Sequence, residues 1–137
     1  MPLDPQVQAY LDQMAALNPP PISVLTPEQV RQGIKMQFAQ FGGGEPEPIA
    51  HVENRTIPGP TGEIPVRIYT PEGSGPFPVL VYLHGGGWVI CDLDTHDSIC
   101  RSLANGVGSV AVSVDYRLAP EHKFPGASAG ITCLLWC

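Results

Sequence analysis

The sequence predicts an α/β fold in which helices cover the faces of an open, mostly parallel sheet. Residues 79–83 and 110–114 are short, almost purely apolar runs, which are typical of parallel strands covered on both faces. A helical segment is predicted between them, and two more precede the first strands. With 137 residues, of which 43% are hydrophobic, the chain is long enough to form one domain with a substantial core.

Two helices are predicted near the N-terminus. The first covers residues 4–17, where Asp4 is the expected N-cap and apolar residues recur at helical spacing. The second covers residues 27–41. Its expected N-cap is Thr26, and Gln29 lies three residues later, as in a capping box.

The glycine run at residues 42–44 is expected to end the second helix, after which the apolar period changes to two. Residues 52–57 and 64–68 are predicted strands joined by a turn, which indicates a hairpin at the edge of the sheet. The two helices lie outside the alternation of strands and helices. We therefore predict that residues 1–45 form a helical cap segment and that residues 46–137 form the first part of an α/β core.

The segment between the two apolar strands carries a third predicted helix, from about residue 95 to about residue 105. Asp94 or Thr95 is its expected N-cap, and Gly106 is its expected end. A strand, a loop, a helix and a second strand in this order favour an open α/β sheet.

Three consecutive glycines, Gly85, Gly86 and Gly87, follow the strand at residues 79–83. Ligands bind at the strand ends of α/β sheets, and glycine lets backbone N–H groups come close to a ligand. Two such N–H groups can stabilise the oxyanion that forms when an ester carbonyl is attacked. From the glycines alone, a structural turn remains an alternative. A phosphate-binding loop is disfavoured because neither Gly-Lys-Ser/Thr nor G-x-G-x-x-G is present.

The residues that flank these glycines resemble the hormone-sensitive-lipase-type (bacterial family IV) carboxylesterases. Residues 78–89, PVLVYLHGGGWV, are similar to the oxyanion-loop signature of that family. Residues 114–125, VDYRLAPEHKFP, are similar to the segment that follows the family's fourth strand. The resemblance extends over about residues 1–125. It implies an α/β-hydrolase fold and the hydrolysis of short acyl esters through a serine acyl-enzyme.

The resemblance also implies roles for individual residues of the loop. In the family, the N–H groups of the second and third loop glycines point at the oxyanion, and these positions are Gly86 and Gly87 here. Gly85, Gly86 and Gly87 together are the expected oxyanion hole. His84 and Trp88 are expected to orient the loop and to wall the pocket.

The family's nucleophile lies in a downstream G-D-S-A-G turn, and its Asp and His come later. This chain reaches Cys137 before those motifs, so we expect it to supply the oxyanion loop, to lack the usual triad and to be inactive alone. Residues 126–130, GASAG, match G-x-S-x-G and make Ser128 a candidate nucleophile, but the preceding residues 123–125, KFP, do not form a strand. The alternative is a non-catalytic hydrolase-like binding protein or an inactive truncated fragment.

Composition and charge narrow the expected partners and location. The net charge is −6 and no cluster of Lys or Arg is present, so binding to nucleic acid or to a membrane is not expected. We find no signal-peptide pattern and expect a cytoplasmic protein. No cofactor or metal is implied, and the expected partner is a small-molecule ester. Without the family's next strand, residues 79–83 would form an exposed apolar edge, which favours self-association.

Overall fold

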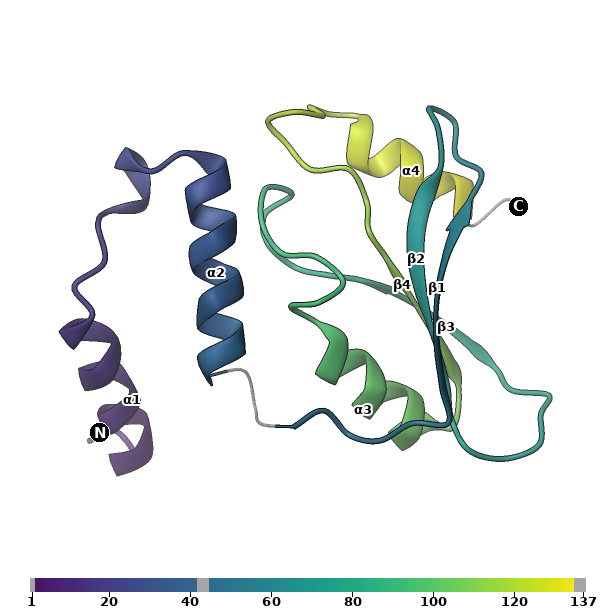
Figure 1. Cartoon of the computed structure of the whole chain (residues 1–137), viewed down its shortest axis with the longest axis horizontal. Helices are drawn as coiled ribbons and strands as arrows, with labels where there is room; N and C mark the ends of the chain where they lie inside the picture. Colours follow the sequence, from purple (N-terminus) through teal and green to yellow (C-terminus); the bar gives the residue numbers. More distant parts are fainter. Residues whose placement is uncertain (1, 42–44, 135–137) are drawn as a thin grey trace.

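The computed structural model describes residues 2–41 and 45–134, and it contains a four-stranded sheet with helices packed on both faces (Figure 1). The elements follow in the order α1 (Pro5–Ala16), η1 (Ile22–Val24), α2 (Pro27–Phe41), β1 (His51–Ile57), β2 (Ile64–Thr70), β3 (Val79–Leu83), α3 (Asp97–Val107), β4 (Val110–Val114) and α4 (Gly126–Leu134). The α/β class predicted from the sequence is confirmed.

The strands lie in the order β1-β2-β4-β3. β1 and β2 form the expected antiparallel hairpin, β2 pairs antiparallel with β4, and β3 pairs parallel with β4. The described sheet is therefore mixed and less parallel than the sequence suggested. Because β3 follows β4 in this order and no described strand lies beyond it, β3 forms an edge of the sheet.

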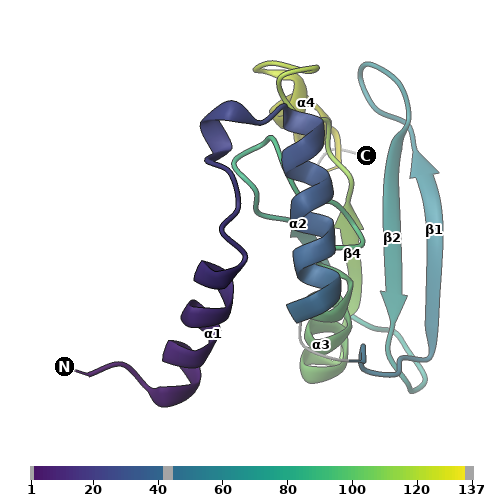
Figure 2. The same cartoon turned by 60° about the vertical axis from the view of Figure 1, so that its left-hand side comes forward.

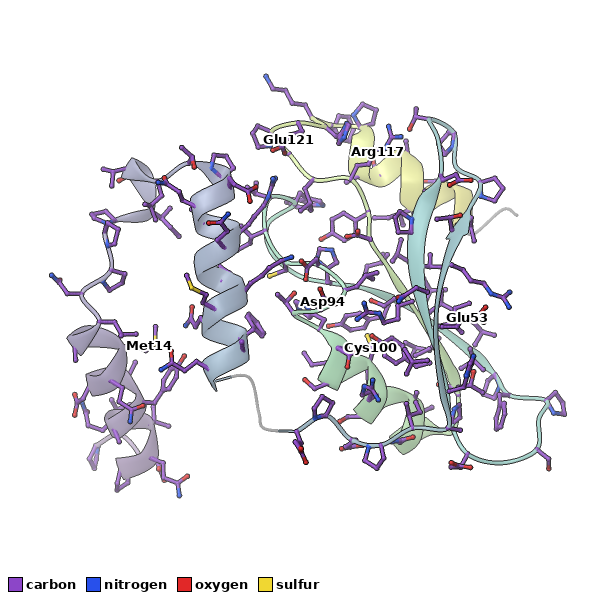
Figure 3. The ribbon with its side chains drawn as sticks, in the orientation of Figure 1. Met14, Glu53, Asp94, Cys100, Arg117 and Glu121 are labelled. Atoms are coloured by element: carbon purple, nitrogen blue, oxygen red, sulfur yellow. The ribbon has the colours of Figure 1, made fainter. Side chains whose placement is uncertain are left out.

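The two faces of the sheet bury separate hydrophobic clusters, because alternate residues of a strand point to opposite faces. On one face, α4 packs through Ala127 and Ile131 against a cluster that includes Val66 and Val114. On the other face, α3 packs against a cluster made of Tyr69, Cys100, Ala104 and Ala111. Figure 3 shows Cys100 on the side of α3 that faces the strands.

The outer strand β3 keeps one face uncovered. Val79, Val81 and Leu83 are 66%, 42% and 41% exposed. Val81 pairs with Val112, which packs against the α4 cluster, so these three side chains lie on the α4 face of the sheet. The described part of α4 packs over β2 and β4, and an apolar strip on β3 remains in contact with solvent.

A polar network ties α3 to β2. The hydroxyl of Tyr69 donates to Asp97 at 2.8 Å, and Arg67 and Arg101 lie 3.2 and 2.6 Å from the same carboxylate. Burial favours the neutral acid, but the hydrogen bonds from Arg101 and Tyr69 outweigh it and lower the pKa of Asp97. The network contributes to stability while Asp97 is ionised.

The third helix begins later than the sequence predicted, at Asp97, and it ends later, at Val107. The carboxylate of Asp92 accepts the N–H groups of Asp94 and Thr95 at 3.0 Å each, so this segment forms a turn before the helix. At the other end, Gly108 takes the left-handed conformation that closes a helix, which we had expected of Gly106.

The two N-terminal helices have the predicted caps. Asp4 accepts from the N–H of Gln6 at 2.8 Å. Thr26 and Gln29 exchange backbone-to-side-chain hydrogen bonds of 2.9 and 3.3 Å, which is the predicted capping box. The glycine run at 42–44, which was expected to end α2, lies outside the described residues.

In both views α1 lies farther from the sheet than α2 does (Figures 1 and 2). None of the residues of α1 is buried, although Met14 points from it toward α2 (Figure 3). Over the described ranges, none of the helices combines the length and the apolar character that crossing a bilayer requires.

Candidate functional site

Two loops start side by side at the same end of the sheet, where β3 and β4 finish. β3 and β4 are parallel, and their last residues, Leu83 and Val114, are register partners. The carboxyl ends of the two strands therefore coincide, and the glycine loop at 84–90 starts beside the loop at 115–125. This brings together the two motifs that the sequence analysis singled out.

The glycine loop turns sharply at Gly86. Its φ is +123°, and a Cβ added there would lie 2.1 Å from the carbonyl oxygen of Ile90, so only glycine fits. The carbonyl oxygen of Gly86 accepts the N–H groups of Val89 and Ile90 at 3.1 and 3.0 Å. Within the described part of the chain, the N–H groups of Gly86 and Gly87 donate no backbone hydrogen bond.

The side chain of His84 is buried and contacts both the glycine loop and Tyr116. It is 3% exposed, and its ring stacks on that of Tyr116 with centroids 4.2 Å apart. Nδ1 lies 2.8 Å from the carbonyl oxygen of Gly85; because a carbonyl can only accept, Nδ1 is assigned the proton. The hydroxyl of Tyr116 donates to the carbonyl oxygen of His84 at 2.6 Å.

The proton on Nδ1 leaves Nε2 of His84 with a lone pair. Nε2 is buried and has no hydrogen-bond partner among the described residues. A general base must lie within reach of the proton that it removes. Among the described residues, no group that could give up a proton lies within hydrogen-bond distance of Nε2 of His84.

The side chain of Trp88 is exposed to solvent. The residue is 66% exposed and has a φ of +61°, which is uncommon for a non-glycine residue. Its carbonyl oxygen accepts the N–H of Ala119 at 2.8 Å, which joins the two loops. Beside it opens a cavity of about 410 Å³, lined by Gly87, Trp88, Ala119, His122, Phe124, Pro125, Ala127 and Ser128.

Ser128 lines the same cavity as Gly87 but lies in the first turn of α4. Its hydroxyl donates to the carbonyl oxygen of Pro125 at 3.0 Å. A nucleophile elbow requires a strand directly before the serine, whereas the described chain between β4 and α4 contains only turns and loops. His122 also lines the cavity, but none of the described hydrogen bonds joins it to Ser128.

The charged groups near the glycine loop differ in their environments. Burial raises the pKa of Asp115, although His84 and Lys35 oppose that shift. Burial alone would raise the pKa of Asp92. The hydrogen bonds from Lys35 and from backbone N–H groups outweigh burial, so the pKa of Asp92 is lowered. Burial and the neighbouring His84 both lower the pKa of His96. Within the described ranges, no three His, Cys, Asp or Glu residues lie close enough to hold a metal ion.

One residue at this site had no role in the sequence analysis. Arg31 of α2 donates to the carbonyl oxygens of Val89 and Ala119 and pairs with Glu121. The only available signal was that Arg31 and Lys35, the two cations of α2, lie four residues apart on one helix face. Their partners are more than 50 residues away in the chain, so the pattern gave no indication of what they bind.

Comparison with known proteins places these loops in a family context. The model of a family described as having the α/β-hydrolase fold matches residues 80–136. The carboxylic ester hydrolase LipN of Mycobacterium tuberculosis is 52% identical over 84 residues, which cover 60% of this chain and 22% of LipN. The esterase LipI of the same organism is 37% identical over 133 residues, which cover 90% of this chain and 42% of LipI.

Solved structures give the same result. A hyperthermophilic esterase from the archaeon Pyrobaculum calidifontis superposes with a TM-score of 0.90 at 42% identity, over 99% of this chain and 44% of that chain. An ester hydrolase from the metagenome of Lake Arreo superposes with a TM-score of 0.86 at 40% identity, over 94% of this chain and 42% of that chain. The chain thus spans less than half the length of the relatives that it matches.

Proposed function

Because the chain belongs to the hormone-sensitive-lipase-type family of α/β-hydrolases, we propose that it contributes the oxyanion-binding part of a carboxylic ester hydrolase. The relatives named above are ester hydrolases and esterases, and the proposed substrates are short acyl esters. The proposed chemistry is attack by a serine on the ester carbonyl, followed by hydrolysis of the acyl-enzyme.

The observation that carries this proposal is the pair of N–H groups on Gly86 and Gly87. They lie at the carboxyl end of β3 and donate no backbone hydrogen bond within the described residues. An attacked carbonyl develops negative charge on its oxygen, and N–H groups held in place beforehand stabilise that charge. Losing one such donor costs about 3 kcal/mol of transition-state stabilisation, roughly a hundredfold in kcat.

The surrounding residues have supporting roles in this proposal. His84, which stacks on Tyr116, holds the start of the loop, and Trp88 forms one wall of the cavity beside Gly87. The cavity of about 410 Å³ would receive the apolar part of the ester. The helical segment of residues 1–45 would act as a cap that closes over the bound acyl group.

The proposal does not give Ser128 the role of nucleophile. Its hydroxyl is bonded to the carbonyl of Pro125 in a helical turn. A working serine also needs a histidine base that is oriented by a carboxylate. We therefore propose that the 137 residues alone do not turn over an ester, and that the uncovered strip on β3 makes them self-associate.

The test is the hydrolysis of a short-chain aryl ester by the purified chain, beside Ser128→Ala and Gly86→Ala. Activity that Ser128→Ala abolishes would show that the late G-x-S-x-G motif is a true elbow and that the assignment above is wrong. If the chain is inactive, the coding DNA beyond residue 137 is read and any G-D-S-A-G in frame is expressed with it.

In an active longer chain, Gly86→Ala should lower kcat about a hundredfold. The matched control is Gly106→Ala, because a Cβ at Gly106 in α3 meets no atom within 4 Å and should leave kcat unchanged. If the longer chain does not hydrolyse the ester, the enzymatic proposal fails and the non-catalytic binding protein becomes the better explanation.

A further inference from the structure

Arg31 of α2 connects the N-terminal helices to both loops of the candidate site. Its Nε donates to the carbonyl oxygen of Val89 at 2.8 Å, and one terminal nitrogen donates to the carbonyl oxygen of Ala119 at 2.9 Å. The two terminal nitrogens also bind the two carboxylate oxygens of Glu121 at 2.9 and 2.8 Å. Glu121 lies in the loop before α4, beside α2 (Figure 3).

These contacts require an arginine. A planar guanidinium presents five N–H groups in fixed directions, so one side chain can bind two carbonyls and one carboxylate together. The Arg31 side chain is 19% exposed, so water competes little for its carbonyl acceptors. A lysine would keep the charge, but its single ammonium cannot reach all three partners in this geometry.

A second cation holds the same loop one helical turn farther along. Lys35 lies 2.6 Å from the carboxylate of Asp92. The other carboxylate oxygen of Asp92 accepts the N–H groups of Asp94 and Thr95. α2 therefore binds the chain that follows β3 at two points, Val89 and Asp92.

A series of hydrogen bonds connects Arg31, through Val89, to the peptide group between Gly86 and Gly87. Arg31 binds the carbonyl of Val89, and the N–H of Val89 binds the carbonyl oxygen of Gly86 at 3.1 Å. The N–H of Ile90 binds the same oxygen at 3.0 Å. That oxygen belongs to the peptide group whose nitrogen is the N–H of Gly87, so its direction sets the direction of that N–H.

We propose that Arg31 is a positioning residue that holds the N–H group of Gly87 in its orientation and couples α2 to the oxyanion site. Its importance for catalysis rests on the function proposed above. The contacts themselves do not, and they can be tested in the chain without any ester.

The experiment measures amide hydrogen exchange by NMR on the full 137-residue chain and on three variants, Arg31→Lys, Glu121→Gln and Arg55→Gln. Exchange reports the local opening of each hydrogen bond. Arg31→Lys should speed exchange of the N–H groups of Val89 and Ile90 at least about tenfold, while β4 exchanges at its original rate. The N–H resonance of Gly87 should shift in the same variant.

The other two variants separate the contributions. Glu121→Gln removes the ion pair but leaves both carbonyl contacts of Arg31, so the loop should open by less than in Arg31→Lys. Arg55→Gln removes an exposed arginine on β1 that pairs with Glu53, and it should not change exchange in the loop.

The inference is overturned if Arg31→Lys changes exchange at Val89 and Ile90 by less than about twofold. It is also overturned if β4 exchanges faster by the same factor, because Arg31 would then support the whole fold and not the loop. Failure of the proposed function would instead appear as an absence of ester turnover with the exchange pattern intact.

Discussion

Replacing Gly86 with alanine tests the shape of the glycine loop most directly. The added Cβ would lie 2.1 Å from the carbonyl oxygen of Ile90 and 2.8 Å from its carbonyl carbon. Real Cβ contacts essentially never fall below 3.0 Å, so the Ile90 carbonyl must move by about 0.9 Å. These atoms belong to the backbone, so no side-chain rotation can relieve the clash.

The cost follows from two features of the loop. A φ of +123° is strained for any residue other than glycine, and such strain costs about 1–3 kcal/mol. Moving Ile90 also weakens the hydrogen bonds from Val89 and Ile90 to Gly86, worth about 1 kcal/mol each. We expect Gly86→Ala to lower the free energy of unfolding by about 3 kcal/mol, a large part of the roughly 5–15 kcal/mol of a small domain.

The assay is urea unfolding followed by circular dichroism, below the concentration at which the chain associates. Gly85→Ala is the matched control, since a Cβ there meets no atom within 4 Å and its φ is not in the left-handed region. It should change the free energy of unfolding by less than about 0.5 kcal/mol. Equal stability of the two variants would refute the described conformation of the loop.

Four further changes probe the rest of the molecule. Asp97→Ala removes a carboxylate that binds a buried tyrosine and two arginines, and urea unfolding should show a loss of about 3 kcal/mol; a loss near zero would contradict the network. Burial raises the pKa of Asp115, so ionised Asp115 disfavours folding, and Asp115→Asn should gain stability relative to the parent as pH rises through the folded pKa, with no gain below about pH 4. The hydrogen bond from Arg31 lowers the pKa of Glu121 to about 2, and in Arg31→Gln an NMR titration should find it near the ordinary 4.5. Val81→Lys on the exposed strip should abolish association in sedimentation velocity, and a parent chain that is monomeric at every concentration would end the self-association proposal.

Local signals in the sequence were enough to predict the four strands and the helices α1, α2 and α3, but not α4. The capping box of Thr26 and Gln29 depends on residues three positions apart, and both of its hydrogen bonds are present. The apolar runs at 79–83 and 110–114 are strands with the predicted bounds. The start of α3 was predicted too early because Asp94 and Thr95 are typical caps, whereas the carboxylate of Asp92 holds their N–H groups in a turn.

Burial was harder to predict than secondary structure. An apolar run such as residues 79–83 indicates a strand covered on both faces, but Val79 and Val81 are 66% and 42% exposed. Coverage depends on which helix reaches which strand, and the described part of α4 packs over β2 and β4. This exposure is expected from the sequence only when the chain is compared with the longer family pattern, in which a further strand lies beside β3.

The sequence by itself determined the four strands, the caps of α1 and α2 and the glycine loop, because each depends on residues that are neighbours in the chain. Only the tertiary structure decided which contacts hold that loop. Tyr116 and Arg31 lie 32 and 58 residues from the loop positions that they bind. Such partners meet because parallel pairing of β3 with β4 brings their ends together and α2 packs beside both loops, and no local pattern of residues encodes that meeting.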